Sequence, residues 1–348
     1  MFLGLTSGIV VFTISITGCM YVFEEEIRDA TESAKLYAPP RQMPFIGLEK
    51  VIANFQTIAP KEKIVSIAIN KRIPNATVEL STKKNSYFFN PYNGTLVYKG
   101  QHDWLDTVEE IHKTLLMGET GKVIQHWSVV TFVIMLISGM ILWFPGQMRL
   151  LKQSLSIKWQ GTIKRINYDL HNVLGFYASW ILVVISLTGL FFAFKEVKTA
   201  AAFFTGTKLT EGKKITSVPP AIFKSLPERY NSIYETTSKQ YPGANFIVIS
   251  VRKSGELRVR ILYPYRWSRN QNTFFFDEGT GQLLRAKFYK EFNGADLIEA
   301  TNYDLHTGRI FGIFGKIVAF IASLISASLP VTGFIIWLRK KRKSHPKG

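Results

Sequence analysis

Histidines are the side chains of this sequence that could bind a metal, and three of them stand just before long apolar segments. These are His112, His171 and His306. Ionisable residues at membrane depth are rare and usually functional, and a neutral imidazole is a common axial ligand of haem iron. Two histidines on facing helices could therefore hold one iron between them. The alternative is that each histidine is an interfacial side chain or a helix cap.

An internal repeat favours the ligand interpretation. Residues 3–18 (LGLTSGIVVFTISITG) align without a gap with residues 174–189 (LGFYASWILVVISLTG). The segment IHKTLLMGETGKVI contains His112 and aligns with LHTGRIFGIFGKIV, which contains His306. The histidine, both glycines of GxxG and the lysine match in this second pair. Matching placement in a duplication indicates a pair of ligands more strongly than one isolated histidine does.

Four nearly uncharged stretches predict four membrane-spanning helices. About 20 apolar residues are needed to cross a bilayer, and these stretches have roughly that length. They lie at residues 2–23, 123–144, 173–194 and 313–338. The predicted order is helix 1–23, insert 24–111, helix 112–145, basic loop 146–170, helix 171–194, insert 195–305, helix 306–338 and basic tail 339–348.

The charge pattern predicts the orientation of these helices. The formal net charge of +18 invites a nucleic-acid function, yet no zinc-finger or RNA-binding signature accompanies it. Lys and Arg instead crowd the short loop at 149–165 and the tail at 339–343. Short basic loops stay in the cytoplasm, whereas long loops cross largely regardless of charge. Both termini are therefore expected in the cytoplasm, with both inserts outside.

The single cysteine, Cys19, excludes an internal disulfide framework and a cysteine-ligated cluster. Residues 16–19 superficially resemble a lipoprotein cleavage site, but no basic region precedes them. Thr-Gly or Ser-Gly occurs late in all four apolar stretches, at 17–18, 138–139, 188–189 and 332–333. Small residues let membrane helices approach closely. We therefore expect Cys19 to be a small residue packed between helices.

Each insert is expected to be a small α+β domain with one helix on a sheet. The predicted helices are residues 48–59 and 221–234, and the strands follow them. An aromatic strand, an Asn or Asp turn ending in Gly, and another strand indicate a hairpin at Asn90–Gly94 and at Asp277–Gly281. The aromatic runs at 87–89 and 274–276 predict sheet core, with a binding surface as the alternative. Residues 263–267 (YPYRW) favour a binding role.

The remaining histidines are weaker candidates. His126 follows His112 by 14 residues, which on one straight helix would bring it back to nearly the same face. However, Gly118 and Gly121 are expected to interrupt that helix, so His126 is expected to be a satisfied polar group between helices. His102 and His345 are expected at the solvent-exposed surface.

The whole chain resembles the bacterial PepSY-associated transmembrane family, which includes iron-regulated membrane proteins and ferric-siderophore reductases. The resemblance rests on the order and spacing of several motifs. They are LGL…SITG at 3–18, IHKTLLMG at 111–118, SGMILWFP at 138–145, DLH…LTG at 169–189 and LHTG…VTGFIIW at 305–337.

This resemblance implies an inner-membrane electron-transfer protein with two b-type haems. His112 and His306 would ligate the outer haem, and His171 the inner one. The acceptor would be a ferric siderophore outside. Because no dinucleotide fingerprint follows a strand, an unknown cytoplasmic or quinol donor would supply the electrons.

The chain departs from the family pattern at its N-terminus. The family has a histidine three residues before the first LGL, as His171 precedes Leu174, and that position would fall just before Met1. We therefore expect a truncated start and a doubtful inner site. Two rival functions stay open. One is a non-enzymatic membrane protein whose PepSY modules bind or regulate a peptidase or another envelope protein, and the other is an accessory to siderophore uptake.

Overall fold

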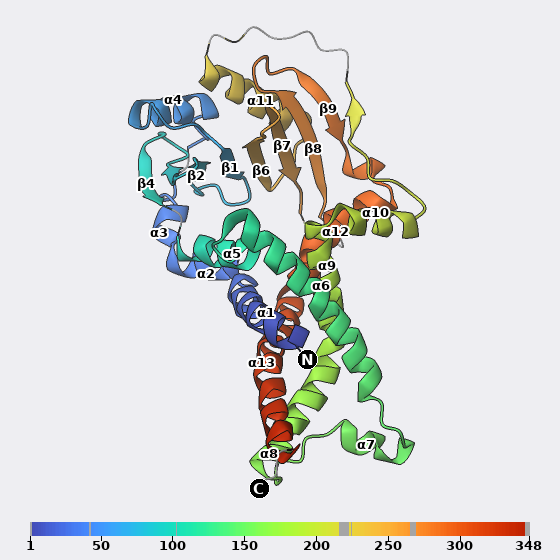
Figure 1. Cartoon of the computed structure of the whole chain (residues 1–348). Coiled ribbons are helices and arrows are strands. Elements are labelled where there is room, and N and C mark those ends of the chain that lie inside the picture. The colour runs from blue at the N-terminus through green and yellow to red at the C-terminus, as the bar shows by residue number, and fades with distance from the viewer. Residues whose placement is uncertain are drawn as a thin grey trace. The chain divides into compact units, whose positions relative to one another are not determined.

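The chain divides into two compact units, each built from segments far apart in the sequence. The computed structural model describes residues 2–41, 43–101, 103–215, 223, 225–264 and 269–344. The helical unit comprises Met1–Glu24, Trp104–Ala201 and Thr301–Gly348. The sheet unit comprises Glu25–Asp103 and Ala202–Ala300. Figure 1 labels the elements of both units.

Four long helices pack side by side in the helical unit (Figure 1). Helix α1 (Phe2–Tyr21) packs on α6 (Gly118–Trp143) and on α13 (Gly312–Ser344), and α9 (Gly175–Ala193) packs on the same two helices. All four contribute to one apolar core: Val11, Phe132, Leu136, Ala178, Leu182 and Ala322. Cys19 is buried in α1, as predicted for a small packed residue.

Among the described residues, three helical segments are long and apolar enough to cross a membrane: Gly118–Trp143, Ile163–Ala193 and Arg309–Lys340. They correspond to three of the four predicted spans. The first predicted span counts as a fourth only if Thr6–Tyr21 and the following Glu24–Thr31 are taken as one segment bent by 54°. The segment Ile163–Ala193 consists of α8 (Ile163–Asp169) and α9, joined by a π-helical turn at Leu170–Leu174.

Shorter helices complete the chain. They are α2 (Glu24–Thr31), α3 (Ser33–Leu36), α5 (Trp104–Thr114), α7 (Leu151–Ser154), α10 (Lys195–Phe204) and α12 (Gly294–His306), with 3₁₀ turns at Met148–Leu150, Tyr289–Glu291 and Arg309–Phe311. The helix is interrupted between α5 and α6, because Leu115 and Leu116 adopt positive φ values of 53° and 58°. The predicted interruption before Gly121 is therefore confirmed.

The sheet unit contains one nine-stranded antiparallel sheet. The first half of the chain supplies β1 (Ser66–Asn70), β2 (Val78–Ser81), β3 (Asn85–Phe89) and β4 (Leu96–Gln101). The second half supplies β5 (Lys213–Lys214), β6 (Phe246–Val251), β7 (Glu256–Leu262), β8 (Gln271–Asp277) and β9 (Leu283–Lys287). Their order is β4-β3-β2-β1-β6-β7-β8-β9-β5. The sequence predicted strands in each insert but not their union through β1 and β6.

One face of the sheet carries the core of this unit. Helices α4 (Leu48–Ile58) and α11 (Leu226–Gln240) pack on it, and Tyr87, Phe89, Phe274 and Phe276 lie in the same cluster. The aromatic runs are thus core residues, as predicted. The predicted helix at 48–59 matches α4. Helix α11 begins at Leu226, where Ser225 caps it by accepting from the Glu228 N–H (3.3 Å) and Pro227 lies in the first turn. Residues 221, 222 and 224 of the predicted helix lie outside the described residues.

Both predicted hairpins are confirmed. Strand β3 pairs with β4 and β8 with β9, and Gly94 and Gly281 adopt φ values of +70° and +66°. Asn90 Oδ1 accepts from the Tyr92 N–H (2.9 Å), and Asp277 Oδ1 accepts from the Thr280 N–H (2.6 Å). Glycine avoids the steric cost of positive φ, and the Asx side chain closes the turn.

Gly121 should be required for the turn that joins α5 to α6. A Cβ at this position would lie 1.7 Å from the Thr114 carbonyl oxygen. Because backbone must move to admit it, we expect Gly121→Ala to destabilise the protein by at least about 1–3 kcal/mol. Thermal unfolding of the detergent-solubilised protein measures this. Gly146→Ala is the matched control, since no described atom lies within 4 Å of its Cβ position. Equal unfolding midpoints for the two variants would contradict the prediction.

Candidate functional site

The structure brings two of the predicted ligands together in the helical unit. His112 lies in the last turn of α5, and His306 is the last residue of α12. Their ring centroids are 6.2 Å apart, with an angle of 66° between the ring planes. The two histidines that match in the repeat are therefore neighbours in space.

Each of these rings is held by a threonine on an adjacent membrane helix. His112 Nδ1 lies 3.1 Å from Thr17 Oγ1 on α1. His306 Nδ1 lies 3.0 Å from Thr188 Oγ1 on α9 and 2.9 Å from the Ile185 carbonyl oxygen. Both threonines belong to the Thr-Gly pairs that end the LGL repeat. Within each half of the duplication, the threonine of the LGL segment therefore contacts the histidine of the second repeated segment.

The third predicted ligand is held in the same way. His171 lies in the π-helical turn before α9, and its Nδ1 is 2.8 Å from Thr332 Oγ1 on α13. In all three cases the glycine after the threonine faces the ring. A Cβ at Gly18, Gly189 or Gly333 would lie 3.3, 3.4 or 3.1 Å from Cε1 of His112, His306 or His171.

The hydrogen bonds of the threonines determine the tautomer of the histidines. A threonine hydroxyl has one hydrogen. Thr17 directs it to the carbonyls of Thr13 (2.8 Å) and Ile14 (3.1 Å), and Thr188 to those of Val184 (2.9 Å) and Ile185 (2.8 Å). Thr332 does the same with Ser328 (2.9 Å) and Leu329 (3.2 Å). Each hydroxyl therefore accepts from the imidazole, so the ring proton resides on Nδ1.

The proton on Nδ1 leaves the Nε2 lone pair of each ring for a ligand. For His306 the assignment is independent of the threonine, because the Ile185 carbonyl oxygen can only accept. Among the described residues, no hydrogen bond engages Nε2 of His112 or His306. Metal-ligating histidines commonly donate their other ring N–H to an oxygen in this manner.

The spacing of the rings also suits one shared metal ion. An imidazole–metal bond is about 2 Å long, so rings on opposite sides of one ion have centroids about 6 Å apart. The observed 6.2 Å agrees with that. In the described part of the chain, no group of three or more His, Cys, Asp or Glu side chains could hold a metal ion. At this spacing, His112 and His306 could supply two imidazole ligands to one metal ion.

His171 borders a cavity of about 380 Å³ inside the helical unit. Its walls are mainly apolar and include Phe132, Trp143 and Phe176. Glycines allow a flat ligand to approach the helix backbone closely, and this cavity is lined by Gly4, Gly8, Gly139, Gly175 and Gly333. Its volume falls in the usual range of about 300–1,000 Å³ for small-molecule sites.

The fourth Ser/Thr-Gly pair, Ser138-Gly139, also borders this cavity, because Gly139 is one of its lining residues. Ser138 donates to the carbonyls of Ile134 (2.8 Å) and Met135 (3.2 Å), as the three threonines do in their helices. Among residues 2–344 that are described, no histidine contacts this pair. The predicted fourth ligand therefore stays a prediction.

His126 takes no part in this arrangement. The helix interruption between α5 and α6 separates His126 from His112. The His126 ring packs against Phe194, with ring centroids 5.5 Å apart. His102, His345 and Tyr265–Trp267 of the YPYRW segment lie outside the described residues.

The sequence alone favours only a helix-packing role for the Thr-Gly pairs, so it does not identify the threonines as partners of the histidines. The available signal was the recurrence of Thr-Gly late in three apolar segments, with Ser-Gly in the fourth. Asn302 was also missed. It is 3% exposed, lies one turn before His306 on α12, and donates to the Thr188 carbonyl at 3.0 Å. This bond fixes the end of α12 against α9.

Thr17 should control the tautomer of His112. In Thr17→Val the hydroxyl acceptor for Nδ1–H is lost and the Ile14 carbonyl is the acceptor that remains beside the ring, so the preference for this tautomer should fall by about 1 kcal/mol. We expect ¹⁵N chemical shifts of ¹⁵N-histidine-labelled protein to show that the Nδ1–H form of one histidine is no longer dominant. Thr17→Ser should keep the wild-type shifts.

Thr131→Val is the matched control for this experiment. The Thr131 hydroxyl makes the same backbone bond, to the Trp127 carbonyl at 3.0 Å, but at an exposed position. An unchanged His112 tautomer in Thr17→Val would show that the threonine does not set it.

Comparison with known protein families matches residues 1–340 to the family described as the PepSY-associated TM region. No curated protein matches the chain significantly.

Proposed function

Because this chain belongs to the PepSY-associated transmembrane family, we propose that it carries electrons across the bacterial inner membrane to ferric siderophores outside. The observation that supports the proposal most directly is the His112–His306 pair. The two rings lie 6.2 Å apart and both have Nδ1 engaged by a neighbouring helix.

In this proposal the haem b groups are held by the histidines through Nε2. His112 and His306 would hold an outer haem, and His171 would hold an inner one. Haem iron supplies the one-electron chemistry, and the protein sets position, ligation and local polarity.

The remaining residues of the site orient these ligands and keep water away. Thr17, Thr188 and Thr332 hold the rings and increase the basicity of Nε2 by accepting from Nδ1. Buried apolar side chains of the four helices, such as Phe132 and Leu136, form a core of low polarity and line the cavity beside His171. In such surroundings a neutral imidazole is strongly preferred over a charged one.

The proposed architecture is a core of four membrane-spanning helices with two extracytoplasmic PepSY-like segments. The basic loop and tail support cytoplasmic termini, since the short loop contains Arg149, Lys152, Lys158, Lys164 and Arg165. An unknown cytoplasmic or quinol donor supplies the electrons.

Ligand assignment can be tested by absorption spectroscopy of the detergent-purified protein. We expect a sharp Soret band and reducible α and β bands. His112→Ala and His306→Ala should each abolish the signal of the same haem, because each removes one of its two axial ligands. His171→Ala should affect a different haem.

His126→Ala is the control for this series and should leave the spectrum unchanged. If both outer variants keep full and unshifted haem absorption, the ligand pair is wrong. If wild-type protein purifies well but stays colourless after haem supplementation, electron transfer is wrong, and a non-enzymatic role in binding or regulating an envelope protein becomes the better hypothesis.

A further inference from the structure

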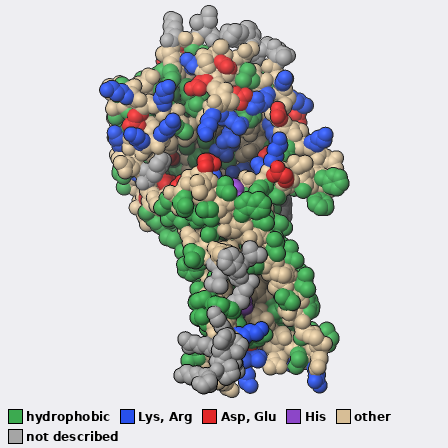
Figure 2. Space-filling model, in the orientation of Figure 1, with side chains coloured by type: hydrophobic (Ala, Val, Ile, Leu, Met, Phe, Trp, Pro, Cys, Tyr) green, Lys and Arg blue, Asp and Glu red, His purple; other side chains and the backbone are tan. Residues whose placement is uncertain are grey.

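The face of the sheet opposite α4 and α11 carries arginines in its middle. In β7, Leu257, Val259 and Ile261 are fully buried in the core. Side chains alternate along a strand, so Arg258 and Arg260 lie on the opposite face. In Figure 2, Lys and Arg side chains gather near the middle of the sheet unit.

The strands beside β7 place two hydroxyl residues and two apolar residues next to these arginines. Arg258 lies between Ser250 on β6 and Phe275 on β8, and Arg260 lies between Val248 and Thr273. Two residues along a strand span about 6.6 Å. The arginines therefore form a pair of positive groups, one beside the aromatic ring of Phe275 and one between shorter side chains.

Neither arginine has an acidic partner within the described residues. No ion pair or hydrogen bond joins Arg258 or Arg260 to another side chain there, and the Nε atom of each is buried without a partner. Burial, and then the charges of Arg258 and Arg269, lower the pKa of Arg260 to about 10, so it still carries its charge at neutral pH.

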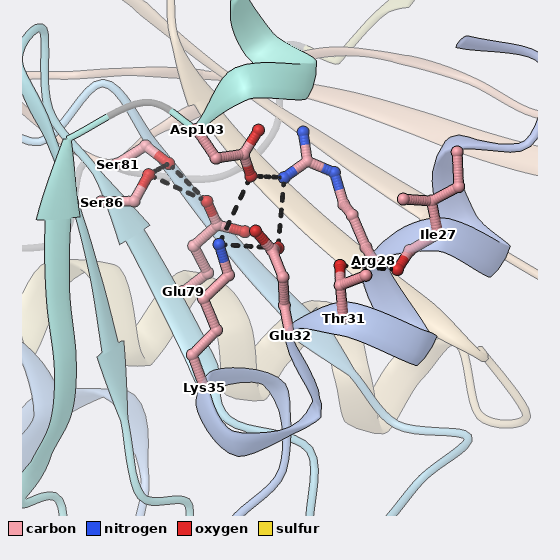
Figure 3. A network of polar contacts seen from close by, with 9 residues as sticks. All are labelled: Ile27, Arg28, Thr31, Glu32, Lys35, Glu79, Ser81, Ser86 and Asp103. Atoms are coloured by element: carbon pink, nitrogen blue, oxygen red, sulfur yellow. Dashed lines mark hydrogen bonds and ion pairs between the residues drawn. The ribbon is translucent and has the colours of Figure 1, made fainter. Parts of the chain in front are cut away.

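Several other cations of this unit are paired with carboxylates. Arg285 forms two bonds to Glu256, at 2.6 and 3.0 Å, and these hydrogen bonds are the main cause that lowers the pKa of Glu256. In the network of Figure 3, Arg28 and Lys35 share Glu32 and Asp103. Among the described residues, Arg258 and Arg260 lack such a carboxylate although both are half-buried.

The first half of the sheet shows what an equivalent strand looks like without such a site. Glu79 on β2 lies opposite Phe88, as Arg258 lies opposite Phe275, and Ser81 lies opposite Ser86, as Arg260 lies opposite Thr273. There Glu79 accepts from Ser81 (3.0 Å) and Ser86 (3.2 Å), so its polar groups are satisfied locally (Figure 3). Among the described residues of these two equivalent strand pairs, β2–β3 and β7–β8, unpaired positive charge occurs only on β7, at Arg258 and Arg260.

Half-buried charges without a counter-charge are unfavourable unless a ligand supplies one. The guanidinium fork matches a carboxylate in a bidentate manner, and two forks match a ligand with two carboxylates. One further group is unpartnered: Oε1 of Gln271, two residues before Thr273, is buried and accepts no hydrogen bond from the described residues. A hydroxyl on the ligand would satisfy it.

We propose that Arg258 and Arg260 form the binding site for an anionic ferric chelate of the hydroxycarboxylate class. The arginines bind two carboxylates, and Gln271 accepts from a hydroxyl. The site rests on the proposed function in that it names the class of ferric substrate.

Calorimetric titration of the full-length protein in detergent tests this site, with ferric citrate, iron-free citrate and tricarballylate, which lacks the hydroxyl of citrate. We expect ferric citrate to bind most tightly and tricarballylate more weakly than citrate. The affinity for ferric citrate should fall when the salt concentration is raised from about 50 to about 200 mM, because salt screens the attraction between opposite charges. Iron-free citrate binding as tightly as ferric citrate would overturn the chelate assignment.

Arg258→Gln and Arg260→Gln should each weaken ferric citrate binding at least about tenfold, since each removes one charge-assisted pair of hydrogen bonds. Arg258→Lys and Arg260→Lys keep the charge but lose the fork and should lie between. Arg72→Gln is the control for overall charge, because Arg72 is exposed and lies after the end of β1 rather than on β7. Equal effects of the Arg72 and Arg258 variants would overturn the site.

Absorption spectra of the same samples separate this proposal from the proposed function. Haem bands with ferric citrate binding that is insensitive to Arg258 and Arg260 would refute the arginine site alone. Colourless protein that binds ferric citrate through these arginines would refute electron transfer and retain the site.

Discussion

The helical unit depends on one interaction, the hydrogen bond from a histidine Nδ1 to a threonine hydroxyl on the next helix. A polar side chain packed between apolar helices must find a protein partner, because its burial without one is unfavourable. His112 with Thr17 and His306 with Thr188 solve this requirement for both partners at once. The bond joins two helices, selects one tautomer and directs the second ring nitrogen away from the threonine. The same contact therefore determines stability, orientation and chemistry.

The glycine after each threonine makes this contact possible. With hydrogen in place of Cβ, the ring of His171 can lie flat against the helix at Gly333, where even a methyl group would be only 3.1 Å from Cε1. Close approach also strengthens packing between helices, for which no hydrophobic driving force exists in lipid. Thr-Gly thus combines a hydrogen-bond acceptor with a steric gap, and neither residue alone would position the imidazole.

Local patterns made part of this structure predictable. The apolar runs, the repeat and the two Asx–Gly hairpins depend on neighbouring residues, and the sequence predicted them with nearly correct bounds. The Thr17–His112 and Thr188–His306 bonds join residues far apart in the chain, so the sequence showed both members without showing that they meet. The pairing of β1 with β6 was missed for the same reason, since Ile67 and Ile249 become neighbours only after both halves have folded.

Duplication explains both the symmetry of the scaffold and the asymmetry of its chemistry. Strands β1 and β6, which occupy equivalent places in the two halves, pair side by side in one sheet. Each half therefore completes the sheet of the other, and neither exposes an unpaired central edge. Core positions must match between the halves, as Leu80 and Val259 do, because both are fully buried. Positions on the other face are free of that constraint. Glu79 and Ser81 could therefore be retained in one half while Arg258 and Arg260 occupy the corresponding places in the other, which separates a structural strand from one available for binding.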